Sequence, residues 1–175
     1  MKTVSRLGLV LAASLVPALL FPTLVSVLAA SAPTIAIHVD RAAPREIEET
    51  TQRALARDYA TAWQAMTEAL DKNRADLLSG NFIGTANEKL SATIQEQVKS
   101  GLHQHITDRG HSVDAVFYSP EGSAIELHDT AHVQINLMDG SKVIHSEDAT
   151  LHYVALLTAA ENSWKVRVFE AVPSF

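Results

Sequence analysis

The stretch IELHDTAHVQINLMDGSKVIHSEDATLHYVALL, residues 125–157, decides the fold. Apolar residues recur at every second position on both sides of Asp139-Gly140. A period of two is typical of a β-strand with one buried face. Asp-Gly between two such runs is a strong signal for a hairpin turn. The stretch therefore predicts two long antiparallel strands that share one apolar face.

Shorter runs on both sides extend the same pattern. Apolar and polar residues alternate over residues 113–117, ahead of a turn-forming segment at 119–122. After a second turn at 161–163, they alternate again over residues 164–168. Four consecutive strands joined by short turns predict an antiparallel meander. One face of this sheet should be apolar and pack against helices, and the other should be polar.

The preceding part of the chain has a helical period. Apolar residues three or four apart between residues 47 and 70 predict a long amphipathic helix, and Pro44 fits its first turn. Residues 71–79 predict a turn and a short helix. Thr85 and Glu88 have the spacing of a capping box, so a second helix is expected over residues 85–100. N-terminal helices followed by a four-stranded antiparallel meander predict an α+β domain over residues 45–175.

Two parts of the chain resemble a known superfamily. The segments ARDYATAWQAMTEAL and ADLLSGNFIGTANEKL, between Ala56 and Leu90, look like the opening of nuclear-transport-factor-2-like (NTF2-like) domains. The segment YVALLTAAENSWKVRVFEAV, residues 153–172, is similar to their closing hairpin. The resemblance implies a cone, in which a strongly curved sheet wraps the first helix and often leaves a pocket. It also implies either a SnoaL-like enzyme or a binding module, because the fold alone does not choose between them.

The first 31 residues predict export. Lys2 and Arg6 precede a run from Leu7 to Ala30 without any charge. A basic start before an apolar run indicates a signal peptide or an N-terminal hydrophobic helix that anchors the chain in a membrane. The run is long enough to span a bilayer, whereas two prolines within it and small residues near its end favour cleavage, so both alternatives stay open. We expect a linker at residues 32–44 and an extracytoplasmic domain, whether periplasmic, secreted or anchored.

Composition excludes several classes of function. The chain has no cysteine, which excludes disulfides, thiol nucleophiles and thiolate metal sites. Of its 14 basic residues, Lys2 and Arg6 lie in the leader, so 12 remain against 20 acidic residues, a net charge of −8. An acidic domain is unsuited to nucleic acid. Because no HExxH, GxSxG or glycine-rich phosphate loop occurs, we expect no cofactor.

One carboxylate interrupts the apolar phase of the second strand. Asp129 takes a core-facing position, and His145 and Glu147 follow on the same phase of the next strand. Because a buried charge often marks a functional pocket, Asp129 and His145 are the candidate catalytic residues. The candidate pocket-lining residues are Tyr59, Trp63, Met66 and Tyr153. The alternative is a β-bulge that turns Asp129 outward, with His145 and Glu147 in solvent at the hairpin tip.

Histidines gather on the polar phase of the same two strands. A three-residue loop at 139–141 would place His132 opposite Asp148 and His128 opposite His152. Such a cluster offers nitrogen and oxygen ligands for Zn²⁺. The alternative is that these histidines are ordinary surface residues, and a two-residue turn would destroy the cluster.

Two functions follow from these observations. The first is a non-catalytic, exported or membrane-anchored module that binds a partner protein or a small hydrophobic ligand, with a homodimer formed through the polar sheet face. The second is a SnoaL-like enzyme with acid–base chemistry on a small hydrophobic substrate. A cavity of about 300 Å³ or more beside a converging Asp–His pair favours an enzyme or a ligand site. A cone filled by Tyr59, Trp63 and Met66 favours an interaction module.

Overall fold

The computed structural model describes residues 35–175. The signal peptide or N-terminal hydrophobic helix that we expect at residues 1–31 lies outside the described residues. Within residues 35–175, no helix has both the length and the apolar character needed to cross a membrane.

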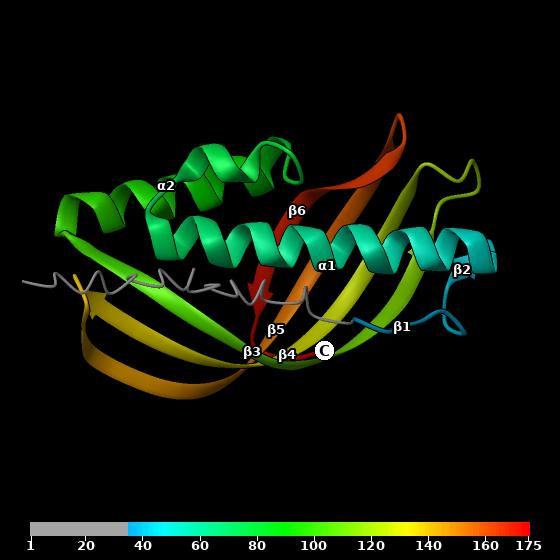
Figure 1. Cartoon of the computed structure of the whole chain (residues 1–175). Coiled ribbons are helices and arrows are strands. Elements are labelled where there is room, and N and C mark those ends of the chain that lie inside the picture. Colours follow the sequence, from blue (N-terminus) through cyan, green and yellow to red (C-terminus); the bar gives the residue numbers. More distant parts are fainter. Residues whose placement is uncertain (1–34) are drawn as a thin grey trace, which may run out of the picture. The chain divides into compact units, whose positions relative to one another are not determined.

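Two α-helices and a short 3₁₀ helix cover one face of a six-stranded sheet (Figure 1). The elements in chain order are β1 (Ile37–His38), β2 (Ala43–Pro44), α1 (Glu49–Lys72), η1 (Ala75–Leu78), α2 (Gly84–Ser100), β3 (Leu102–Tyr118), β4 (Ala124–Asp139), β5 (Lys142–Ala160) and β6 (Ser163–Val172). The strand order is β1-β3-β4-β5-β6, and β2 also pairs with β3. The α+β class and the antiparallel meander of four long strands, β3 to β6, are confirmed.

The sheet has two more strands than we predicted. β1 and β2 are short and run parallel to β3, beside its second half. Ile35 and Ile37 are buried in the core, and burying apolar surface offsets the cost of ordering this segment. The prediction of a linker over residues 32–44 is therefore wrong for its described part. Pro44 lies in β2 and not in the first turn of α1.

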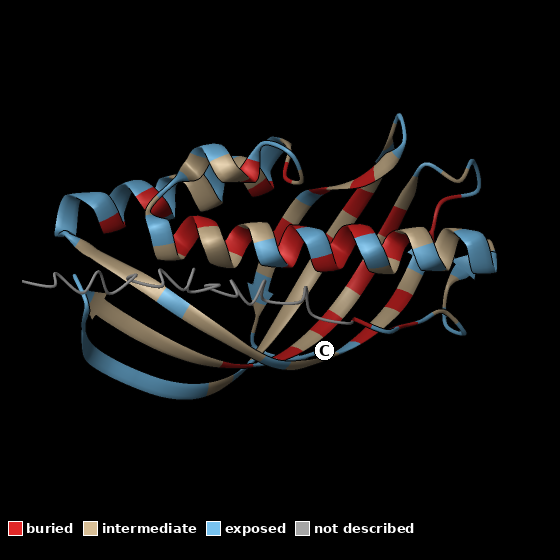
Figure 2. Ribbon diagram, in the orientation of Figure 1, coloured by how far each residue is buried: buried red, intermediate tan, exposed pale blue. Residues whose placement is uncertain are grey.

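α1 lies along the inner face of the curved sheet, and one stripe of it is buried (Figure 2). The stripe includes Leu55, Tyr59, Trp63, Met66 and Leu70, which recur at three- or four-residue steps. This stripe confirms the periodicity on which the helix was predicted. Because the sheet wraps around the helix, residues of all four long strands face it, and the core forms between them.

α2 confirms the second predicted helix but not its predicted cap. The N-cap is Ile83, and no side chain caps the start of the helix. The Thr85 hydroxyl instead donates to the carbonyl oxygen of Arg167 in β6, at 3.1 Å. A residue whose spacing indicates a local cap thus links α2 to the last strand of the sheet.

The β4–β5 hairpin has a different register from the one we considered. Asp139 lies opposite Lys142, so the turn has two residues. Met138 then pairs with Val143, but Leu137 pairs with His145, because Ile144 is an extra residue in β5. The two-residue turn and the bulge each shift the register by one residue. Inner positions therefore stay opposite inner positions, but each pair is moved by two residues relative to a three-residue loop.

Trp164 fixes the start of β6 to α1. Its backbone N–H donates to Asp58 Oδ2 in α1 at 2.7 Å. The residue is 9% exposed, and its ring lies edge-on to Tyr118 with centroids 6.4 Å apart. The burial that the alternation of β6 predicts for this side chain is confirmed.

Trp164→Ala should therefore lower the free energy of unfolding by about 3–5 kcal/mol, the usual cost of deleting a large aromatic side chain from a core. Trp164→Phe keeps much of the apolar surface and should lose less. Denaturant unfolding of the two variants measures both values. A loss below about 1 kcal/mol for Trp164→Ala would mean that the side chain contributes no more than a surface residue.

Candidate functional site

A carboxylate lies in the middle of the apolar face of the sheet. Asp129 in β4 follows Leu127 and precedes Ala131 on the inner phase, and it has no exposed surface. β4 pairs with β5 without interruption across this position, so no bulge turns Asp129 outward. Because the buried carboxylate has lost its hydration, it needs hydrogen-bond donors from the protein.

Tyr59 provides one donor from α1. Its hydroxyl donates to Asp129 Oδ2 at 2.7 Å. Burial raises the pKa of the Tyr59 phenol well above its ordinary value, and the charge of Asp129 and this hydrogen bond raise it further. The phenol therefore stays protonated and remains a donor. The structure thus brings together two of the residues that we considered for the site.

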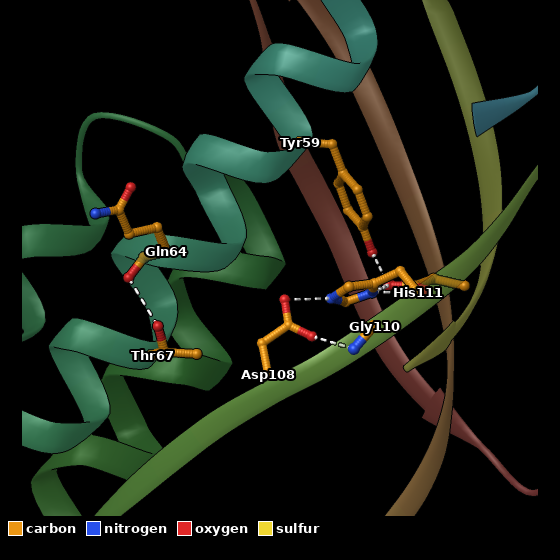
Figure 3. Close-up of polar contacts among 7 residues, drawn as sticks. Tyr59, Gln64, Thr67, Asp108, Gly110 and His111 are labelled. Atoms are coloured by element: carbon orange, nitrogen blue, oxygen red, sulfur yellow. Dashed lines mark hydrogen bonds and ion pairs between the residues drawn. The ribbon is translucent and has the colours of Figure 1, made fainter. Parts of the chain in front are cut away.

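His111 in β3 makes the second contact, and sequence analysis missed it. Its Nδ1 lies 2.9 Å from both carboxylate oxygens of Asp129, and its side chain is 2% exposed. Its Nε2 lies 3.3 Å from Oδ2 of Asp108 (Figure 3). The sequence does indicate that His111 faces inward, because it lies two residues before Val113 and four before Ala115, in the same alternation.

A β-bulge brings Asp108 and His111 to the same face. The pairing of β3 with β4 skips Arg109, which is the extra residue. Asp108 Oδ1 accepts the backbone N–H of Gly110 at 2.7 Å and thereby fixes the bulge (Figure 3). In a regular strand without a bulge, positions 108 and 111 are three residues apart and would point to opposite faces of the sheet.

The resulting network has the groups of an acid–base site but is closed to solvent. The His111 imidazole bonds Asp129 through Nδ1, whereas its Nε2 and the Oδ2 atom of Asp108 are buried without a hydrogen bond in the part of the chain that the structure describes. Trp63 contacts His111 edge-on, with ring centroids 4.8 Å apart, and also contacts Tyr153, with ring centroids 5.6 Å apart. Since Trp63 and Asp129 are both buried, the network holds α1 against β3 and β4 and offers no room for a substrate.

A half-open pocket of about 250 Å³ lies between the two helices and the sheet. Met66 and Tyr153, which we expected to line a pocket, line this one, whereas Tyr59 and Trp63 lie in the core outside its lining. Burial, and then the charge of Asp129, raises the pKa of Tyr153 to about 12, so its phenol is neutral. The lining consists of Met66, Leu70, Leu90, Ile106, Ile135, Leu151, Tyr153, Phe169 and Ala171, with Lys89, Thr93 and Gln104 as its polar members.

His145 does not join Asp129. The side chains of His145 and Glu147 lie on the exposed part of β5, 62% and 56% exposed, and their Nε2 and Oε2 atoms are 3.6 Å apart. The two candidate catalytic residues are not brought together, because His145 lies opposite Leu137 near the turn, far along β4 from Asp129. The partner that Asp129 has instead is His111.

The four metal candidates are not brought together. His132 lies opposite Thr150 and bonds its hydroxyl, and His152 bonds the hydroxyl of Thr130, both at 3.1 Å. His128 contacts Glu126 at 3.1 Å, and Asp148 lies opposite Gln134. The two-residue shift in register separates the predicted pairs. Among residues 35–175, no group of three histidine or carboxylate side chains could hold a metal ion.

Comparison with known proteins identifies the fold. No protein-family model matches the chain, and no curated protein matches it in sequence. The intermembrane-space region of the chloroplast protein ARC6 is similar in structure, with a TM-score of 0.62 and 17% identity over 75% of this chain and 100% of that one. A scytalone dehydratase-like protein from Novosphingobium aromaticivorans matches over 70% of this chain and 83% of that one, with a TM-score of 0.47 and 12% identity. Aln2 from a Streptomyces species matches over 73% and 94%, with a TM-score of 0.47 and 13% identity.

At these identities the likeness concerns the fold alone. The described domain has an NTF2-like fold, as the resemblance of the sequence implies.

The role of the Tyr59 hydroxyl can be tested by its removal. Tyr59→Phe takes one donor from a buried carboxylate and should lower the free energy of unfolding by about 1.5–3 kcal/mol. Tyr153→Phe is the matched control, because this phenol is also largely buried but makes no hydrogen bond to Asp129 within the described residues; it should lose less than about 1 kcal/mol. Thermal and denaturant unfolding compare the two. A gain in stability for Tyr59→Phe would indicate the strain of an active site and contradict a structural role.

Proposed function

We propose that this protein is a non-catalytic binding module whose pocket receives an apolar side chain from a partner protein. The observation that carries the proposal is that the pocket and the buried acid–base pair, which an enzyme would need together, are separate. The pocket is mostly apolar, and the Asp129–His111 pair is buried against Trp63, outside the pocket lining.

The size of the pocket supports this choice over a small-molecule site. Sites for small molecules usually have about 300–1,000 Å³ and enclose most of the ligand. The volume here is about 250 Å³, and the pocket is open on one side. A side chain that enters from a larger partner needs no more room, since the rest of the partner lies outside the pocket.

The enzyme alternative has one feature in its favour, the contact of Asp129 with His111 at 2.9 Å. A general base must come within about 2.6–3.2 Å of the proton that it removes, directly or through one water molecule. Asp129 is fully buried, and the side chain of His111 is 2% exposed. Neither residue belongs to the lining of the pocket, so the binding module is the better supported function.

Binding of an apolar side chain can be measured directly. N-acetyl-leucine amide should shift the methyl NMR resonances of Leu90 and Leu151, with a dissociation constant on the order of millimolar for so small a probe. Ala171→Phe fills the pocket and should abolish these shifts. Ala92→Phe introduces the same ring at an exposed position of α2 outside the lining and should leave them unchanged. Equal shifts in both variants would contradict the assignment of the pocket.

We also propose that the domain lies outside the cytoplasm. The support is Lys2 and Arg6 ahead of the uncharged run from Leu7 to Ala30. Protease added to intact spheroplasts should degrade the domain, and a cytoplasmic protein in the same sample should survive. Full protection of the domain would contradict export, and the mass of the mature N-terminus would separate a cleaved signal peptide from an anchor.

A further inference from the structure

One half of β5 has a free edge. Within residues 35–175, β6 pairs with β5 only from His152 onward, where His152 lies opposite Val172. The part from Lys142 to Leu151 pairs with β4 alone, and most of it is exposed (Figure 2). Its outer N–H and C=O groups therefore lack strand partners, and an edge of this kind is a template for an added strand.

The end of the chain turns away from this edge. Pro173 follows β6 and has no N–H to donate, so it does not continue the pairing. Phe175 instead stacks on His128, with ring centroids 4.3 Å apart and planes at 11°. His128 lies on the outer face of the sheet, because it is three positions, an odd number, from the inner-facing Ala131 along β4. Within the described residues, no strand therefore lies beside β5 beyond the pair of His152 with Val172.

The free edge leads into the pocket. Leu151, the last residue of the edge, and Ala171 in β6 both belong to the pocket lining. Ala171 lies opposite Tyr153. An added strand in line with β6 would have a residue opposite Leu151. That residue would occupy the next inner-facing position after Ala171. That residue would enter the pocket.

The edge also carries two weakly paired carboxylates. Glu147 lies on the inner phase and Asp148 on the outer one, with side chains 56% and 78% exposed. Their nearest basic groups are His145 at 3.6 Å and Arg109 at 4.0 Å. Exposed pairs at such distances contribute little, so both carboxylates remain available to basic side chains of a partner.

We propose that the β5 edge from His145 to Leu151 binds an extended basic segment of a partner protein as an added antiparallel strand. The inference deepens the proposed function and rests on it, because the first inner residue of the segment is the apolar side chain in the pocket. Counting from that residue, the third and fourth following residues lie opposite Asp148 and Glu147. An apolar residue followed by lysine or arginine at these positions therefore defines the partner segment.

A second copy of this chain fits the edge less well. Two β5 strands paired about Asp148 would place like charges opposite each other. Pairing about Ser146 would bring the bulge at Ile144 into the interface from both sides. The regular part of the edge, residues 145–151, suits a short separate strand better.

The test uses the full chain and two labelled probe peptides. The basic probe is acetyl-Leu-Thr-Val-Lys-Lys-Thr-Val-amide, and the acidic probe has Glu in place of both Lys residues. Fluorescence anisotropy should give the basic probe an affinity about tenfold higher than the acidic one. The double variant Glu147→Lys with Asp148→Lys should reverse this preference. Hydrogen exchange at the amides of residues 145–151 should slow only when a peptide is bound.

A control probe and two further measurements separate the possible outcomes. A basic probe with alternate N-methyl groups keeps its charge but lacks strand donors, and it should bind at least about tenfold more weakly. Equal binding of both probes, or a preference that the double variant does not reverse, would overturn the added strand. If N-acetyl-leucine amide still enters the pocket in that case, only this inference fails; if it does not, the proposed function fails too. Concentration-dependent dimerisation that the basic probe does not disrupt would assign the edge to a second copy and also overturn the proposal.

Discussion

The carboxylate of Asp129 joins one helix and two strands at a point without solvent. Tyr59 reaches it from α1, 70 positions away in the chain, and His111 reaches it from β3, 18 positions away. Because an unpaired buried carboxylate costs far more than a lost apolar contact, α1 must lie where Tyr59 can donate to it. Apolar packing alone would tolerate small shifts of the helix along the sheet. We infer that this charge selects one position among them.

Extra residues in the long strands decide which side chains meet. The bulge at Arg109 turns Asp108 to the same face as His111, and the bulge at Ile144 shifts the whole β4–β5 register. The first bulge completes the buried network, and the second, together with the two-residue turn, separates the outer-face histidines from Asp148. Each bulge acts through a single inserted residue, since a single step in a strand exchanges the faces of the sheet.

The backbone N–H and C=O groups of β5 have strand partners on both edges after His152 but on one edge only before it. From His152 to Thr158, β5 has partners on both edges, and its inner residues Ala155 and Leu157 are fully buried. Before His152 the strand keeps a single partner and an exposed surface. The pocket lies at this boundary, next to Leu151, Tyr153 and Ala171. The binding site that we propose therefore lies where the closed core of the sheet meets its open edge.

The sequence by itself determined the two helices, the four long strands and the α+β class. Each of these depends on a period of two or 3.6 residues, which is a local property of the chain. Only the tertiary structure decided that Asp129 points inward and pairs with His111 and not His145. It also decided that residues 35–44 join the sheet and that Met66 and Tyr153 line the pocket whereas Tyr59 and Trp63 do not. These outcomes depend on bulges that move a register by one or two residues and on contacts between distant segments. A bulge leaves the local alternation almost unchanged, so its position follows from how the strands pack around α1 and not from the pattern of the residues.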